Sequence, residues 1–183
     1  MSYRLKDATN ITLGPAEILI GDSSTYIEYI TPILTQDNYF AYSEKTNIVY
    51  TTSYNERSAV NSNNLIEDMV SDRVACTMEM STVELSKNIL FLLSSILPST
   101  VENSIALNKV ADIDFRVEIN YNYIDKQKNL QFIFPKVRIR SGLNLVFSSD
   151  AEVVQYLYMY SLPTYTTPWE NHNLGIMYMN GFE

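Results

Sequence analysis

The sequence predicts a mainly β (α+β) domain: an antiparallel β-sandwich or barrel with one packed α-helix at about residues 82–97. Residues 112–123 alternate strictly between polar and apolar side chains, which is the period of a β-strand. Residues 74–81 alternate in the same way and pass directly into a helical period. The other apolar runs are short and rich in β-branched and aromatic residues. A single helix among strands must cover a sheet, because each buries its apolar face against the other.

Composition limits the possible functions. A chain of 183 residues is most simply one domain, and 46% hydrophobic with 19% charged residues is too apolar for disorder. The net charge of −8 argues against tight nucleic-acid binding, because phosphate contacts require a basic surface. One cysteine excludes an intramolecular disulfide framework. No apolar run approaches the roughly 20 residues of a membrane helix, so we expect no membrane insertion.

The first third of the chain is expected to consist of an arm followed by short strands. Residues 1–10 are the expected N-terminal arm, and residues 11–21 contain the first strand. Glycine, aspartate and serine at 21–24 predict a turn. Residues 25–34 predict a second strand because they are β-branched and aromatic, and 37–44 predict a shorter third one.

Residues 44–72 differ in being polar, with an asparagine-rich centre at 61–64. Within them, 47–53 have some strand character and 65–70 some helical character. We expect a long loop here, either a surface loop or a protrusion that docks on a neighbour. We favour docking because loops of this length in compact domains tend to be functional.

The central stretch is one strand followed by one helix. Its apolar strand face contains Val74, Cys76, Met78 and Met80. Ser81 with Glu84 three residues later forms a capping-box pattern. The helical face that follows contains Leu85, Ile89, Leu92, Leu93 and Ile96, and Pro98 ends the helix.

A long antiparallel hairpin follows. Residues 112–123 place apolar side chains on one face and polar ones on a wet face. The return segment, 130–140, changes phase: its apolar residues are even-numbered up to Phe134 and odd-numbered from Val137. One extra residue near Pro135 restores a single apolar face, which is the effect of a β-bulge. The residues of both signs that then share the wet face are Asp112, Asp114, Glu118, Lys136, Arg138 and Arg140.

The C-terminal part alternates strand and loop. Residues 142–148 predict a strand, 153–162 either a strand or a helix, 164–169 a loop, and 174–179 a last strand. The chain has no internal repeat.

Catalytic and metal-binding patterns are missing from the sequence. Cys76 belongs to an apolar strand face and is expected in the core, whereas His172 lies in a turn setting. One cysteine and one histidine are too few for a structural zinc site. Asp112, Asp114 and Glu118 are chemically suited to acid–base work or calcium, but carboxylates interleaved with basic residues on a strand favour a solvated face. We therefore expect no enzyme activity, no catalytic residue, no metal and no cofactor.

The order of these pieces resembles the major tail tube proteins of tailed bacteriophages, which are related to type VI secretion and contractile injection tubes. The resemblance covers most of the chain and lies in three segments: Ile-Thr-Leu-Gly-Pro-Ala-Glu-Ile at 11–18, Thr-Met-Glu-Met-Ser-Thr-Val-Glu-Leu-Ser-Lys-Asn-Ile-Leu at 77–90, and Phe-Pro-Lys-Val-Arg-Ile-Arg-Ser-Gly-Leu-Asn-Leu at 134–145. The chain departs from the pattern at 165–183, a stretch that the resemblance does not place, and in the basic residues of the hairpin.

The resemblance implies a structural virion protein, assembled in the host cytoplasm into stacked hexameric rings that form a tail tube. The tube is the conduit for DNA ejection; DNA passes through it without specific binding. The implied partners are further copies of the chain, a tape-measure protein, baseplate and terminator proteins, and a sheath protein in contractile tails. The candidate lumen-facing residues are Asp112, Asp114 and Glu118, whose acidity would repel phosphate. The candidate inter-ring loop residues are Asn55, Glu56, Arg57, Asn61, Asn63 and Asn64.

Two alternatives remain open. The first is a tail terminator or baseplate hub component of the same fold, which would cap a tube without polymerising. The second is a β-sandwich carbohydrate-binding module, because the 14 tyrosines of the chain are able to stack on sugars.

Overall fold

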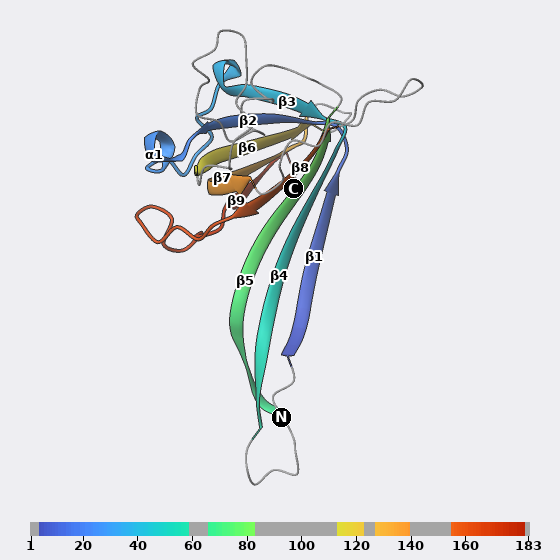
Figure 1. Cartoon of the computed structure of the whole chain (residues 1–183), viewed down its shortest axis with the longest axis vertical. Coiled ribbons are helices and arrows are strands. Elements are labelled where there is room, and N and C mark those ends of the chain that lie inside the picture. Colours follow the sequence, from blue (N-terminus) through green and yellow to red (C-terminus); the bar gives the residue numbers. More distant parts are fainter. Residues whose placement is uncertain (1–3, 59–65, 83–112, 123–126, 140–154, 182–183) are drawn as a thin grey trace, which may run out of the picture.

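The computed structural model describes residues 4–58, 66–82, 113–122, 127–139 and 155–181 (Figure 1). These residues form one nine-stranded antiparallel sheet with one short α-helix, which confirms the predicted mainly β class. The elements are β1 (Arg4–Leu13), β2 (Ala16–Asp22), α1 (Ser23–Tyr26), a 3₁₀ turn (Gln36–Asn38), β3 (Tyr39–Ser43), β4 (Lys45–Ser58), β5 (Ile66–Thr82), β6 (Phe115–Asn122), β7 (Asn129–Ile139), β8 (Gln155–Ser161) and β9 (Ile176–Asn180).

The sheet has two halves that meet at the pairing of β7 with β8. Its strand order is β1-β4-β5-β8-β7-β6-β2-β3, and β9 pairs with β7 outside this path. Residues 137–139 of β7 pair with β8, whereas residues 129–133 pair with β9. Buried side chains from both halves form one hydrophobic cluster, which includes Ile48, Met78 and Leu157 from one half and Ile18, Val117 and Phe132 from the other.

The expected loop at 44–72 is wrong in its conformation, because most of it is strand. β4 and β5 form a long hairpin that pairs from Lys45 opposite Ser81 to Ser58 opposite Ile66, with register shifts after Ser53 and after Arg57. The helical turn expected at 65–70 is likewise wrong, since Ile66 begins β5. Residues 59–65 lie outside the described residues. Figure 1 shows this hairpin extending from the body of the molecule, with β1 beside it.

The N-terminal arm expected at 1–10 is also strand from Arg4 onward. β1 pairs with β4 from Arg4 opposite Asn55 to Leu13 opposite Thr46. The segment is therefore the outermost strand of the described sheet at this end.

The predicted hairpin of β6 and β7, with its bulge, is confirmed. Phe115 lies opposite Val137, whereas Val117 lies opposite Phe134, so β7 contains one extra residue at Pro135 and Lys136. The five apolar residues on the two sides of the bulge consequently share one face. All five belong to the core: Leu130, Phe132, Phe134, Val137 and Ile139.

The second strand expected at 25–34 is wrong. Asp22 caps a four-residue helix, α1, by accepting hydrogen bonds from the backbone amide of Ser24 at 2.7 Å and from its hydroxyl at 2.6 Å. Both hydrogen bonds lower the pKa of Asp22, and the bond from the Ser24 hydroxyl has the larger effect. Residues 27–35 then contain no helix or strand. They are held by hydrogen bonds to Arg116 and Glu118 of β6, and an alternating sequence pattern gives no sign of such distant partners.

Of the remaining elements, the segment 153–162 is resolved in favour of a strand, β8, and the last strand is confirmed as β9. The third strand is confirmed as β3, and 164–169 contain no strand or helix. β5 ends at Thr82, where the helix was expected to begin; the rest of that helix, 83–97, and the strand expected at 142–148 lie outside the described residues.

Candidate functional site

The core face of β5 is buried from Cys76 to Thr82, in the part of the strand whose side chains the structure describes. Cys76, Met78 and Met80 are all buried, as predicted from their spacing. Burial raises the pKa of the Cys76 thiol to about 12, because the thiolate would lose its hydration. The thiol is therefore protonated at neutral pH and behaves as a small hydrophobe.

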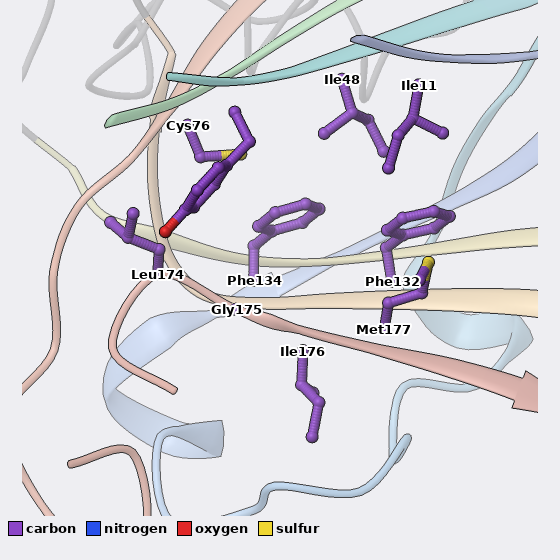
Figure 2. Close-up of a pocket in the computed structure, with 10 residues that line it drawn as sticks. Ile11, Ile48, Cys76, Phe132, Phe134, Leu174, Gly175, Ile176 and Met177 are labelled. Carbon is purple, nitrogen blue, oxygen red and sulfur yellow. The ribbon is translucent and has the colours of Figure 1, made fainter. Parts of the chain in front are cut away.

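An apolar cavity of about 260 Å³ lies where the β4–β5 hairpin leaves the body. In Figure 2, Phe132 and Phe134 lie across this space from Ile11, Ile48 and Cys76. Its other lining residues are Tyr50, Leu174, Gly175, Ile176 and Met177. Catalytic sites require convergent polar groups at a cleft. The cavity lining has a tyrosine and a protonated thiol as its polar side chains, so we assign it to packing between the two halves of the sheet.

The polar face of β6 is not wet, which corrects the prediction for its central residues. Arg116 is fully buried and Glu118 is 2% exposed. Arg116 donates from Nε to Glu118 Oε1 at 2.8 Å, and its Nη2 lies 2.7 Å from the same oxygen. Arg116 Nη1 donates to the carbonyls of Tyr26 and Tyr29, and Nη2 to that of Thr31 at 2.9 Å. Every nitrogen of this buried cation thus has an acceptor, as burial of a charge requires.

The chain that covers this ion pair is held through its own backbone. Glu118 accepts hydrogen bonds from the amides of Ile33 at 3.1 Å and Leu34 at 3.4 Å. Trp169 is completely buried and donates from its indole nitrogen to the carbonyl of Ile27 at 2.5 Å. Its ring centroid lies 5.9 Å from the Arg116 guanidinium carbon, within cation–π range. Two segments, 22–35 and the loop before β9, therefore cover the outer face of β2, β6 and β7; we call them the covering segments.

Asp114 retains part of the predicted surface character. Its side chain is 23% exposed and accepts two hydrogen bonds from Arg138, from Nε at 3.0 Å and from Nη2 at 2.7 Å. Lys136 Nζ lies 3.2 Å from its other oxygen. The expected pairing of opposite charges across β6 and β7 is therefore present, and two cations neutralise this carboxylate.

Among the described residues, no segment covers the outer face of β4, β5 and β8, in contrast to that of β2, β6 and β7. We call it the open face; its residues are Lys45, Asn47, Val49, Thr77, Glu79, Ser81, Tyr156, Tyr158 and Tyr160, all exposed or half-buried. Tyr158 lies opposite Glu79, and their hydrogen bond raises the pKa of Tyr158. Shallow hollows on either side of Glu79 are lined by Asn47 together with Tyr156 or Tyr158.

The candidate residues from the sequence are not brought together. Asn55, Glu56 and Arg57 lie on β4 opposite Val70, Met69 and Asp68 of β5. Asn61, Asn63, Asn64 and Asp112 lie outside the described residues. Glu118 of β6 is buried and cannot line a lumen, which leaves Asp114, the residue just before β6, among the described candidates for the lumen.

The buried ion pair and the open face were both missed by the sequence reasoning. Arg116 and Glu118 at positions i and i+2 share a strand face, which was visible in the sequence, but nothing local indicated a cover. The tyrosines at 156, 158 and 160 alternate with Leu157 and Met159, and this alternation was a sufficient signal for a half-buried strand.

The described residues contain neither a metal-binding cluster nor a membrane-spanning helix. Within the described ranges, no group of three or more His, Cys, Asp and Glu side chains is placed to hold a metal ion. His172 is exposed, and its backbone amide donates to the carbonyl of Trp169 at 2.9 Å. Over the same ranges, no helix has the length and apolar character needed to cross a membrane.

No protein-family model and no curated protein sequence matches this chain.

Proposed function

We propose that this protein is a structural subunit that assembles into stacked rings, forming a tube of the kind found in the tails of tailed bacteriophages. The observation that carries the proposal is the projecting hairpin. Beyond Ser53 and Arg73, β4 and β5 pair with each other and, near Arg4, with β1. β1 pairs with β4 as far as Asn55, so the described ribbon is two-stranded from Glu56 to Ser58, which is about 10 Å at about 3.4 Å per residue. A two-stranded ribbon is marginally stable alone in water, so one that reaches this far is expected to pack against a neighbouring subunit.

The free ends of the sheet support association within a ring. β1 and β3 end the strand order, and each pairs with one neighbour among the described residues. Edge strands present unpaired backbone groups that favour addition of another chain. Because β1 and β3 are different edges, pairing between them would be head to tail, which closes into a ring when the rotation permits.

Negative-stain electron microscopy of the purified protein across a concentration series tests the proposal. Hexameric rings or hollow tubes are expected. A protein that stays monomeric at every concentration, with or without baseplate components as nuclei, would overturn it.

The hairpin itself is tested by a shortened variant. Residues 55–70 are replaced by Asn-Gly, which joins Tyr54 to Ser71, its partner in register, through a tight turn. We expect a folded subunit that no longer stacks. Native-like Trp169 fluorescence controls for folding, and long tubes from the shortened variant would refute the docking role of the hairpin.

The two alternatives predict different outcomes. A tail terminator or baseplate hub component would form single rings that do not stack. A carbohydrate-binding module is favoured by the exposure of Tyr156 and Tyr158, at 43% and 45%, on one sheet face. Saturable binding on a glycan array, lost in a Tyr156→Ala/Tyr158→Ala variant, would support that function over a tube.

A further inference from the structure

The covering segments close only part of the outer face of β2, β6 and β7. They are hydrogen-bonded to Arg116 and Glu118 of β6. Further along the same strands, and on β9, the outer face carries side-chain amides that are half-buried or exposed. In Figure 1, β2, β6, β7 and β9 follow one another across the body of the molecule. This part of the sheet therefore presents a continuous polar surface.

Strand register arranges these side chains in two rows across the sheet, which we call the amide rows. The first row contains Glu17, Asn120 and Gln131, and the second contains Asn122, Asn129 and Asn180. Within a row, each residue lies opposite the next one on the neighbouring strand. Neighbouring strands are about 4.8 Å apart and alternate residues of a strand about 7 Å apart, so the rows form a flat lattice of polar groups.

Hydrogen bonds along each row hold the amides in fixed orientations. Gln131 Nε2 donates to Asn120 Oδ1 at 3.0 Å, and Asn120 Nδ2 donates to Glu17 Oε2 at 3.1 Å. In the second row, Asn180 Nδ2 donates to Asn129 Oδ1 at 2.7 Å. A carboxamide has two donor hydrogens and an oxygen with two lone pairs, so within the described residues these bonds use half or less of each amide's capacity. The remaining capacity is pre-oriented, which lowers the entropic cost of binding a ligand.

The amide rows carry little net charge. Glu17 is their one ionisable member, and Gln36 donates to its Oε1 at 2.6 Å. The next outer-face residue of β6 is Glu118, which Arg116 neutralises. Exposed charged residues of both signs adjoin this region in the sequence: Asp37 after Gln36, Glu44 after β3, and Lys128 before β7. Because a polyanion requires several basic contacts, this balance of charge favours a neutral ligand.

A tyrosine lies at each end of the first row. Tyr42 of β3 lies opposite Glu17 and is 48% exposed. Tyr178 of β9 lies opposite Gln131, and its hydroxyl donates to the carbonyl of Ile30 at 3.3 Å. With its two tyrosines the row crosses β3, β2, β6, β7 and β9, a width of about 19 Å at about 4.8 Å between strands. The surface thus combines amides with aromatic rings at both ends.

We propose that the amide rows bind a neutral glycan chain, which lies across the strands between Tyr42 and Tyr178. Adjacent hydroxyl groups of a sugar both donate and accept hydrogen bonds, as carboxamides do, and the apolar face of a sugar ring packs on tyrosine. The centres of protein interfaces are instead enriched in aromatic residues, methionine and arginine. The site is separate from the tyrosines of the open face, and it goes beyond the proposed function because it does not require assembly.

Isothermal titration calorimetry of the purified full chain tests the inference. The neutral probes are maltohexaose, cellohexaose, mannohexaose and N-acetylchitohexaose, and heparin is the polyanionic probe. We expect saturable binding of at least one neutral probe and weaker or no binding of heparin. The inference is overturned if none of the neutral probes binds, or if heparin binds as tightly as the best of them.

Two double variants locate the site. Asn120→Ala/Gln131→Ala removes the amides of the first row, and Asn129→Ala/Asn180→Ala removes two of the second. Each should weaken binding by about tenfold or more, the loss expected when two hydrogen bonds are removed. The matched control is Asn171→Ala, which removes an exposed amide from the loop before β9 and should leave the affinity unchanged.

Folding and location are separated by the remaining measurements. Native-like Trp169 emission shows that a variant is folded, and the second-row variant suffices if the first-row variant does not fold. Unchanged affinity in the folded amide variants would overturn the inference, and loss of binding in Tyr156→Ala/Tyr158→Ala would then place the glycan on the open face. A protein that forms neither rings nor tubes contradicts the proposed function alone, because the titration does not depend on assembly.

Discussion

The buried ion pair of β6 gives the sharpest prediction about stability. Glu118→Gln keeps the shape of the side chain but removes its charge, which leaves the Arg116 guanidinium buried without a counterion. The new amide group also faces a conflict, because the Glu118 oxygens accept hydrogen bonds from the backbone amides of Ile33 and Leu34. An amide nitrogen at either oxygen position would place a donor against a donor.

The expected cost follows from this geometry. Breaking a buried ion pair by changing one partner typically costs about 3–5 kcal/mol. With an m-value of about 2 kcal/mol per molar urea, the unfolding midpoint should fall by about 1.5–2.5 M. The assay is equilibrium urea unfolding followed by Trp169 fluorescence, which reports directly on the cover of the ion pair.

A matched control lies on the same strand face. Asp114→Asn makes the same change in net charge, but its ion pairs are partly exposed and should be worth less than about 1 kcal/mol. If Glu118→Gln shifts the midpoint no more than Asp114→Asn does, the buried pair does not hold the covering segments as described. An unchanged m-value in both variants is required for the comparison.

Three other predictions concern single positions. Burial raises the pKa of Cys76 from 9.0 to about 12, so between these pH values the folded protein keeps the thiol proton that the unfolded chain loses. The free energy of unfolding should therefore fall as the pH rises from about 9 to 12. Urea midpoints measured over this range should not show this decrease in a Cys76→Ala variant. Gly175 has φ +151°, and an added Cβ would lie 2.7 Å from the Ile133 carbonyl oxygen, so Gly175→Ala should destabilise the protein by more than about 1 kcal/mol. Gly14→Ala should not, because the nearest atom to its added Cβ is 3.6 Å away. Thermal unfolding distinguishes the two variants. Trp169 is the single tryptophan and is completely buried, so its emission should be blue-shifted in the native protein and should move to longer wavelength on unfolding; exposed-type emission from the native protein would contradict this placement.

The hairpin shows why polar strands escape prediction from sequence. A strand with one buried face alternates between apolar and polar residues, and that period is the signal for the element. Val74 is 39% exposed, and beyond it residues 53–58 and 66–73 continue the hairpin without a strict alternation of apolar and polar residues. Their pairing continues from Met78 opposite Ile48, a contact between distant segments, and its register shifts after Ser53 and again after Arg57.

The sequence by itself determined the features that follow from local period. The β class, the apolar faces of β5 and β6, the burial of Cys76 and the bulge at Pro135 all follow from alternation with a period of two and from the backbone chemistry of proline.

Only the tertiary structure decided which polar face is covered. Alternation separates two faces of a strand, but it does not say what lies above each one. Arg116 and Glu118 are buried because backbone carbonyls and amides of residues 26–34 hydrogen-bond to them and the ring of Trp169 packs against Arg116. Residues 26–34 lie more than 80 positions before this pair in the sequence, and Trp169 lies more than 50 positions after it. Tyr158 and Glu79 contact each other on the open face, where no described segment of the chain lies over them.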